Sequence, residues 1–268
     1  MAKLAYETHN SLDLRLPFIL GRGHLSAPRR QGANNWHENI ELIRITSGTG
    51  YIRRGSKDIP VEQGDIFVAN SNIPHRVCTE HSLRCTYLII DNSFFRSNGP
   101  DPEKLYFQEV IRDPELNELF DRVQQSYSAY DPEDACTVAE MRYAVLGVLC
   151  RLCRFYITAP PSDDRNTVSP PVKLALAYIR GHLDSPLSLE SVARQVNVSR
   201  SYLAREFKAC TGQTVVQAIN LIRCTQAQQM IENGTSVSHA AAACGYENLS
   251  YFSRTFKKLM GHLPSHSK

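Results

Sequence analysis

The sequence predicts a chain of two domains: an N-terminal all-β domain with helices after it, and a C-terminal all-α domain. Three observations support this fold class. Short strand-like runs separated by turn residues occupy residues 33–90, and helical spacing of apolar residues follows them. A stretch rich in Pro, Ser and Asp, Thr158 to Pro171, then separates the two parts. Near the C-terminal end, twelve residues that begin at Ser201 recur, with changes, from Ser250.

Length and composition indicate a soluble protein. The 268 residues are enough for two domains, and 42% apolar and 21% charged residues are typical of globular chains. The polar start, MAKLAYETHN, is not a secretory signal, and the longest apolar patch, from Tyr143, is broken by Arg151 before it could span a membrane. Eight cysteines without an export signal favour a reducing compartment. We therefore expect a cytoplasmic protein with no membrane association.

The β domain places polar side chains among apolar ones. We expect strands at 40–45, 51–54, 57–61, 64–70 and 85–90, with SGTG at 47–50 as a turn. His37 and Glu41 share parity with Ile43 and Ile45, so all four face one side of a strand region. Another histidine, His75, follows in a later run. Such groups in an apolar interior are costly unless they pair with one another or bind something.

Residues 114–157 have the spacing of helices. One apolar stripe consists of Val138, Met141, Val145, Val148, Leu149, Leu152 and Tyr156. The stripe either packs against the β domain or forms a dimer interface with a second copy, and we predict a homodimer through helices within 114–157. Cys150 and Cys153 lie within the same helical stripe and have no second cysteine pair at metal-binding spacing, so we expect them to pack in the core.

Charge is divided unevenly along the chain. From Val172 onward there are eleven Lys and Arg against five Asp and Glu, a net charge of +6, whereas the preceding residues have 19 against 22, a net charge of −3. A basic C-terminal part on a slightly acidic body suggests a nucleic-acid-binding module attached to another domain.

Each copy of the repeat is predicted to be a helix, a tight turn and a second helix. In the first unit Ser188 caps a short helix, Asn197 makes the turn, and Ser199 caps a second helix that Gly212 ends. Helix, tight turn, helix is the arrangement that places its second helix in a major groove of DNA.

The second unit has the same parts. We expect Ser238 to cap its first helix and Gly245 to make its turn. Residues 214–233 between the units are predicted to form one helix of roughly 28 Å, close to the roughly 34 Å between successive major-groove openings on one face of DNA. Two rigidly joined units would thus read two adjacent groove segments.

The C-terminal part, from Val172 onward, resembles the AraC/XylS family of bacterial transcription regulators. The matches are FK and the terminal Gly in both repeats, Arg223 and Ala227 in the linking helix, and GYENLSYFSRTFKK in the second unit. Three positions depart from the family pattern: Asn197, where Gly is usual, and Ala240 and Ala242, where bulkier apolar residues are common. The resemblance implies a tandem helix-turn-helix domain, dimerisation, and RNA polymerase as a partner.

The N-terminal part is similar to a cupin barrel. His37, Glu41 and Gly48 have the spacing of its first motif, and Gly64 and His75 that of its second. Asn35 stands where the first motif usually has a histidine, so the resemblance implies three of four metal ligands. Three alternatives remain open: a small-molecule pocket, a metal site, or side chains that serve only the barrel architecture. We predict the pocket, without cofactor, with ligand-binding residues Trp36, His37, Glu41, His75 and Tyr87.

Helix geometry predicts which side chains meet DNA. Leu203 and Phe207 point inward, as do Phe252 and Phe256. The opposite faces give the predicted DNA contacts, which are Arg200, Ser201, Ala204, Arg205, Lys208, Asn248, Leu249, Ser250, Ser253, Arg254, Lys257 and Lys258. Arg205 and Arg254 occupy equivalent positions suited to guanine, and an ion pair with Glu206 is the alternative for Arg205; the lysines suit phosphates. Arg223 either holds the linking helix to one unit or contacts a phosphate.

Together these features predict a sequence-specific transcription regulator and not an enzyme. Residues 1–157 would form the cupin-like effector-binding and dimerisation domain, 158–171 a linker, and 172–268 the DNA-binding domain. The effector would be a small molecule, with sugars the first group to test. The alternatives are a metal-dependent cupin enzyme fused to a DNA-binding domain, and a constitutive DNA binder with a purely structural barrel.

Overall fold

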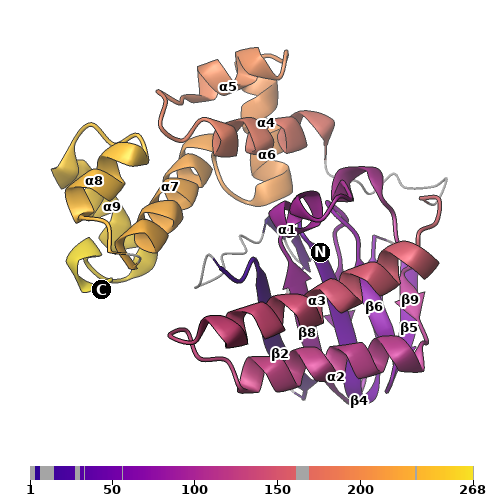
Figure 1. Cartoon of the computed structure of the whole chain (residues 1–268). Coiled ribbons are helices and arrows are strands. Elements are labelled where there is room, and N and C mark those ends of the chain that lie inside the picture. The colour runs from indigo at the N-terminus through magenta and orange to yellow at the C-terminus, as the bar shows by residue number, and fades with distance from the viewer. Residues whose placement is uncertain are drawn as a thin grey trace. The chain divides into compact units, whose positions relative to one another are not determined.

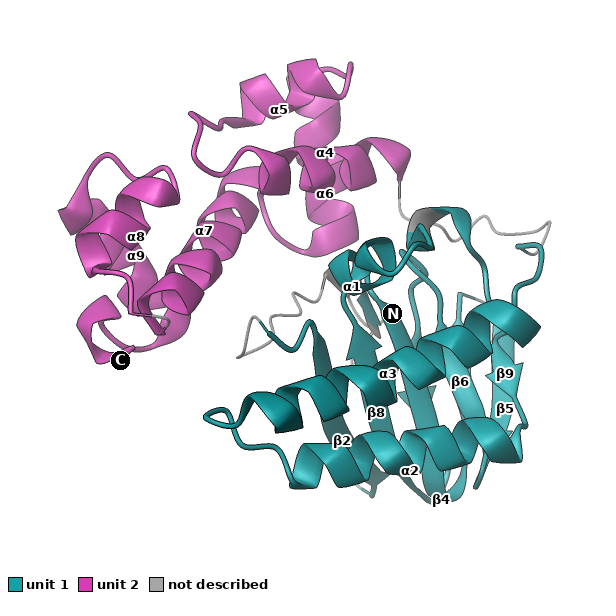
Figure 2. Ribbon diagram, in the orientation of Figure 1, with its two compact units in different colours: residues 1–2, 11–167 teal, residues 3–10, 168–268 magenta. Residues whose placement is uncertain are grey.

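The protein was analysed as a computed structural model. The residues it describes are 4–6, 15–27, 31–32, 34–55, 57–160, 169–232 and 234–267. The chain forms two compact units, residues 1–2 with 11–167 and residues 3–10 with 168–268 (Figure 2). The first unit combines strands and helices, and the second is mainly helical (Figure 1).

The first unit is built on an antiparallel sheet. Its strands, in spatial order, are β2 (Phe18–Ser26), β8 (Ser82–Ile90), β4 (Ile40–Arg54), β6 (Ile66–Ala69) and β9 (Val110–Ile111), while β5 (Lys57–Glu62) and β7 (Arg76–Cys78) pair with the second half of β4. The short strand β3 (Asn34–Trp36) also lies in the first unit, whereas the short strand β1 (Leu4–Tyr6) belongs to the second. The strands expected between residues 40 and 90 are present. The strand-like pattern did not extend to β2.

The SGTG segment was predicted as a turn, and this prediction is wrong. It lies inside the 15-residue strand β4, whose pairing with β8 shifts register between Ile45 and Ser47. Gly48 has φ +82°, and a Cβ there would collide with the Ser82 carbonyl oxygen. This irregularity lets β4 leave its pairing with β8 and β6 and continue as the partner of β5 and β7.

The two faces of β4 meet different surroundings. Ile43 and Ile45 belong to the apolar cluster on the inner side of the strands, as their parity predicts. Ile40 and Leu42 point the other way, into the cluster shared with the helices. Helix α1 (Asn92–Ser97) follows β8, and the long helices α2 (Pro114–Ser128) and α3 (Ala135–Phe155) form a hairpin across the outer face of the sheet (Figure 1).

The apolar stripe of α3 is part of the core of the first unit. Its members from Val138 to Leu152 are buried, and Tyr156 packs against the same cluster. Of the two alternatives for the stripe, packing against the β domain is therefore the observed one, and these side chains are not available to a second copy. Cys153 packs at the edge of this core, whereas Cys150 is exposed, contrary to the prediction.

One buried carboxylate joins the ends of the hairpin. Asp113 caps α2 by accepting a hydrogen bond from the Glu115 amide, and it also accepts from Arg151 Nε and the Tyr156 hydroxyl, each at 2.8 Å. Burial opposes the charge on this carboxylate, but the hydrogen bonds outweigh it and hold the pKa of Asp113 below its ordinary value. The start of α2 is thereby tied to the end of α3.

The second unit is two helix-turn-helix units joined by one long helix (Figure 1). Its helices are α4 (Pro170–Gly181), α5 (Leu189–Gln195), α6 (Arg200–Thr211), α7 (Val215–Glu232), α8 (Val237–Ala243) and α9 (Leu249–Met260). Helix α4 begins two residues inside the predicted linker, and residues 161–168 of that linker lie outside the described residues. Across the described part of the chain, no helix combines the length and apolarity needed to cross a membrane.

The local signals of the repeat are largely confirmed. The predicted caps, turn and helix end of the first unit are observed at Ser188, Asn197 (φ +55°), Ser199 and Gly212. In the second unit Gly245 makes the turn, with φ +75°. The predicted cap Ser238 is wrong: the Ser236 hydroxyl accepts the hydrogen bond from the His239 amide, because Ser236 has the extended backbone of a cap and Ser238 already lies in the first turn.

Candidate effector pocket and nucleic-acid interface

The first unit encloses a cavity of about 300 Å³ on the inner side of its strands. It is lined by Gly23, His24, Leu25, Gly32, Glu41, Ile43, Val77, Cys85 and Tyr87. Apolar walls with a carboxylate, an imidazole and a phenol are typical of small-ligand sites, and the volume lies at the lower end of their range.

Glycines on β2 shape one wall of this cavity. Gly21 and Gly23 are the register partners of Tyr87 and Cys85 on β8. A Cβ at Gly21 would collide with the Tyr87 ring, and one at Gly23 would lie 2.8 Å from the Cys85 sulfur. The two glycines therefore make room for the side chains that line the cavity.

Three of the predicted ligand-binding residues form one cluster, in which two histidines face the same oxygen of Glu41. His37 Nε2 lies 3.0 Å and His75 Nε2 3.1 Å from Glu41 Oε2. The other ring nitrogen of each histidine faces a backbone carbonyl, Asn39 O at 2.9 Å and Ile73 O at 3.1 Å. All three side chains are buried. Parity along the chain placed His37 and Glu41 on one side, and the resemblance to a cupin barrel added His75 to the predicted ligand-binding residues.

The charges in the cluster are strongly coupled. Burial alone would raise the pKa of Glu41, but hydrogen bonds from His37 and His75 and their positive charge outweigh burial and hold that pKa far below its ordinary value. Glu41 is therefore a carboxylate at neutral pH. Burial, with the nearby Glu41 charge, raises the pKa of the cavity-lining Cys85 thiol to about 11, so Cys85 is protonated and unreactive there.

The cluster also fits a divalent metal ion. A backbone carbonyl only accepts hydrogen bonds, so each Nδ1 carries a proton, and in a neutral imidazole each Nε2 then presents a lone pair towards the Glu41 carboxylate. Lone pairs that face a carboxylate repel it, so extra protons on the histidines or a bound cation must offset this repulsion. Two Nε2 atoms and a carboxylate oxygen, all within 4.8 Å of one another, form a ligand set used for divalent iron and related metals.

The two predicted aromatic ligands differ in position. Tyr87 lines the cavity, but Trp36 is fully buried and does not line it. Trp36 therefore lacks the exposed ring face that stacking requires, and its assignment to the pocket is not supported. The sequence analysis missed the wall formed by Gly23, His24 and Leu25 because it did not predict β2. The apolar residues at the start of that strand, Phe18 to Leu20, were the available signal.

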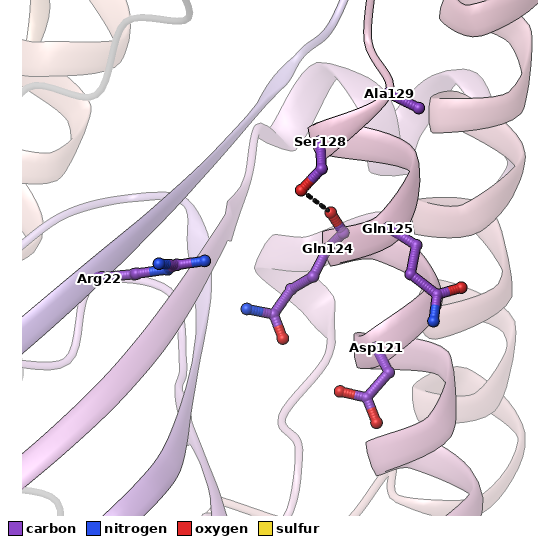
Figure 3. Close-up of a pocket in the computed structure, with 6 residues that line it drawn as sticks. All are labelled: Arg22, Asp121, Gln124, Gln125, Ser128 and Ala129. Atoms are coloured by element: carbon purple, nitrogen blue, oxygen red, sulfur yellow. Dashed lines mark hydrogen bonds between the residues drawn. The ribbon is translucent and has the colours of Figure 1, made fainter.

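A second, more open hollow of about 600 Å³ lies on the outer side of the sheet. It is lined by Arg22, Asp121, Gln124, Gln125, Ser128 and Ala129. Figure 3 shows Arg22 on β2 extending towards Gln124 on α2. Arg22, Thr86 and Arg44 are register neighbours across three strands, and Arg44 donates a hydrogen bond to Asp121 at 2.6 Å. Arg22 is exposed, and most residues that line this groove carry polar side chains, whereas apolar side chains form much of the inner cavity.

Helix α6 presents most of its predicted contacts to solvent. Arg200, Ser201, Arg205 and Lys208 are exposed and Ala204 is half-buried, while the inward pair Leu203 and Phe207 is fully buried. The predicted alternative partner of Arg205 is present, but Glu206 lies at 3.8 Å and the Arg205 side chain is 73% exposed. Such a contact contributes little and leaves the guanidinium available.

Helix α9 presents the equivalent surface. Leu249, Ser250, Arg254, Lys257 and Lys258 are exposed, and Ser253 is half-buried. Asn248 has a structural task, since its side-chain oxygen caps α9 by accepting from the Tyr251 amide at 2.9 Å. The exposed rings of Tyr202 and Tyr251 on the two second helices were missed by the sequence analysis, although they recur in the repeat.

Arg223 has the position that the structural alternative predicts. Its side chain is buried in the middle of α7, and Nη2 donates a hydrogen bond to the Ser185 carbonyl at 2.7 Å. These contacts are those of the structural alternative, and the burial of the side chain disfavours the phosphate alternative.

Comparisons with known proteins agree with both units. A family model for helix-turn-helix domains matches residues 192–268, and one for cupin domains matches residues 25–91. RhaR, a transcriptional activator of Salmonella typhi, is 23% identical over 250 residues, which are 89% of this chain and 87% of RhaR. The chain belongs to the AraC/XylS family of transcription regulators.

Solved structures that are similar to parts or most of this chain include those of AraT and ToxT. The C-terminal domain of AraT, a response regulator from Geobacillus stearothermophilus, is 35% identical over 37% of this chain and 84% of that domain, with a TM-score of 0.36. ToxT from Vibrio cholerae is 15% identical over 93% of this chain and 96% of ToxT, with a TM-score of 0.46. As an AraC/XylS regulator, the chain binds DNA through its helix-turn-helix units and has a cupin-type domain for effector binding.

Proposed function

We propose that a small hydroxylated metabolite, with sugars as the first candidates, binds in the inner cavity of the cupin-like unit and controls transcription. The observation that supports this most is the position of Glu41, a carboxylate at the wall of a 300 Å³ cavity that two histidines keep charged. A fixed carboxylate accepts hydrogen bonds from ligand hydroxyls, and the Tyr87 ring offers a face for a sugar ring.

A thermal-shift screen of sugars and small metabolites against the full chain tests this proposal, because a ligand that binds only the folded state raises its melting temperature. For a hit, Tyr87→Ala and Glu41→Gln are expected to weaken binding about tenfold or more. Arg22→Ala is the matched control, since Arg22 lies in the outer groove. Loss of binding in Arg22→Ala with full binding in Tyr87→Ala would move the effector to that groove.

A divalent metal in the His37, Glu41 and His75 cluster is the second candidate, because three possible ligand atoms lie within 4.8 Å of one another there. The ion would act as a Lewis acid or hold an effector oxygen. Metal analysis of the purified full chain is expected to find one ion per chain in the wild type and none in His75→Ala. Because metal binding releases protons, occupancy should fall on acidification. A bound ion together with turnover of a metabolite would instead support the enzyme alternative.

We also propose that the regulator acts in the cytoplasm as a homodimer that contacts RNA polymerase. With the α3 stripe buried, the helix hairpin would contribute its outer side chains, of which Tyr143 is 75% and Phe155 56% exposed. Large exposed apolar side chains are typical of interaction surfaces. The Tyr143→Arg variant is expected to be monomeric in analytical ultracentrifugation at concentrations where the wild type is dimeric.

For DNA, we propose that α6 and α9 enter successive major grooves on one face of the duplex. Helix α7 has 18 residues, roughly 27 Å of helix. Selection of bound duplexes from a random DNA library tests this: two short conserved elements about one helical turn apart are expected. A single element would contradict docking of both units. A constitutive binder would select the same DNA but show the same affinity with every effector tested.

A further inference from the structure

We infer that Arg223 and Gly245 form an interlock that fixes the spacing and orientation of the two helix-turn-helix units. Helix α7 alone would not fix that geometry, because the chain could bend at either end of the helix. The inference rests on the proposed docking of both units and assigns Arg223 as a positioning residue for it.

Arg223 connects three parts of the DNA-binding unit. It lies on α7, and its Nη2 donates to the carbonyl of Ser185, in the turn between α4 and α5 of the first helix-turn-helix unit. On its other side the guanidinium lies 5.5 Å from the centre of the Tyr246 ring, which follows the turn of the second unit. The side chain is 8% exposed, so these contacts are shielded from water.

Gly245 completes the contact from the side of the second unit. Its backbone has φ +75°, and a Cβ there would collide with the Leu183 carbonyl oxygen and lie 2.6 Å from Arg223 Nη2. The turn of the second unit therefore packs directly against the segment that follows α4. Glycine is required here both for the backbone conformation and for the absence of a side chain.

Tyr246 anchors this contact to α7. Its hydroxyl lies 3.1 Å from the Asn220 side-chain oxygen and 3.3 Å from the Cys224 sulfur. Arg223, Asn220 and Cys224 thus hold the second turn along one side of α7. Because Ser185 and Leu183 belong to the first unit, a change in the angle between the units would break several buried contacts at once.

The consequence concerns DNA spacing. One inserted base pair moves a groove element by about 3.4 Å along the duplex and rotates it by about a tenth of a turn. If the two units are held rigidly, only one of them can still bind its element on the displaced DNA. If they can move relative to each other, both still bind. The interlock should therefore set how strictly this regulator discriminates between spacings.

The experiment measures this spacing penalty with the full-length protein. The wild type first selects its DNA from a random duplex library, and gel shifts then compare the selected duplex with one carrying an extra base pair between its two elements. We expect a penalty of about tenfold or more in Kd for the wild type and below about threefold for Arg223→Ala, because linked sites lose their effective concentration when geometry fails.

Matched variants separate the interlock from general damage. Gln226→Ala changes an exposed residue of the same helix, and Gly261→Ala imposes the same backbone strain as Gly245→Ala without any atom within 4 Å of its Cβ. Both should keep the wild-type penalty, whereas Gly245→Ala should lose it. If Arg223→Ala fails to fold, the same ratio of Kd values for the two duplexes is measured for Arg223→Lys and Gly245→Ala.

The outcomes separate a failure of the proposed two-unit docking from a failure of the interlock alone. A library selection that yields only one DNA element removes the proposed two-unit docking, and the interlock with it. Two elements together with a wild-type penalty in folded Arg223 and Gly245 variants overturn the interlock alone.

Discussion

The second helices of the two helix-turn-helix units share several residues of the repeat, yet the turns before them satisfy different demands. Asn197 in the first turn adopts a left-handed backbone and is exposed. Gly245 in the second turn has a similar φ but also lies against Leu183 and Arg223. The first turn needs only a residue that tolerates positive φ, whereas the second also needs the absence of a side chain.

The supports of the two units differ as well. In the first, α4 packs against α5 and α6, with Leu176 and Ile179 buried. In the second, α8 and α9 pack on α7 around small residues such as Ala240, Ala241 and Cys244. The repeated residues therefore specify a similar reading surface, while unrepeated neighbours specify the scaffold behind it. Of the alanines that depart from the family pattern, Ala240 is fully buried in this core and Ala242 is exposed.

The largest effect is expected from substitutions in the two turns. Gly245→Ala is expected to lower the free energy of unfolding of the helical unit by about 3 kcal/mol, since it adds a collision to positive φ, whereas Asn197→Ala should cost about 1 kcal/mol. Urea unfolding followed by circular dichroism measures the helices. Fluorescence of Trp36, the only tryptophan, reports the cupin-like unit and should not change. Equal losses in the two variants would show that the second turn is not crowded.

The two reading helices allow the next test. Arg205→Ala and Arg254→Ala are each expected to cost about 1–3 kcal/mol of discrimination between selected and scrambled DNA, each at a different element of the selected sequence. Lys257→Ala should weaken both DNAs alike, because phosphate contacts carry no sequence information. Gel shifts on both duplexes measure this. Equal loss on both DNAs in the arginine variants would contradict base reading by these residues.

The helix caps allow the smallest test. Ser236→Ala and Ser188→Ala should each lower the stability of the helical unit by about 1 kcal/mol, because each removes an observed cap. Ser238→Ala should change it by less than about 0.5 kcal/mol. The same urea unfolding measures all three variants. A larger loss in Ser238→Ala than in Ser236→Ala would restore the cap predicted from the sequence.

The fold was predicted best where the signals are local. Ser199, Asn197 and Gly212 identify helix ends by capping chemistry that acts within four residues, and these ends are observed as predicted. Prediction failed where a strand lacks an aliphatic pattern. Strand β2 reads FILGRGHLS, and its glycines and polar residues resemble a loop until their partners on β8 are known. One wall of the cavity was lost with that strand.

The candidate site shows the same division. Strand parity placed His37 and Glu41 on one side of the chain, and the structure brings them into contact. Trp36 was assigned to the pocket because its ring suits a sugar, but chemical type does not reveal whether a side chain reaches the cavity or the core. The α3 stripe likewise suited two surfaces equally well, since an amphipathic helix does not identify what covers it.

By itself, the sequence determined the helices, the turns and the faces that they present, because capping and side-chain periodicity depend on near neighbours. Only the tertiary structure decided what the buried polar groups meet. Arg223 finds Ser185 across 38 residues, and His75 finds Glu41 across 34. Contacts over such distances depend on how whole elements pack, and no local pattern encodes them.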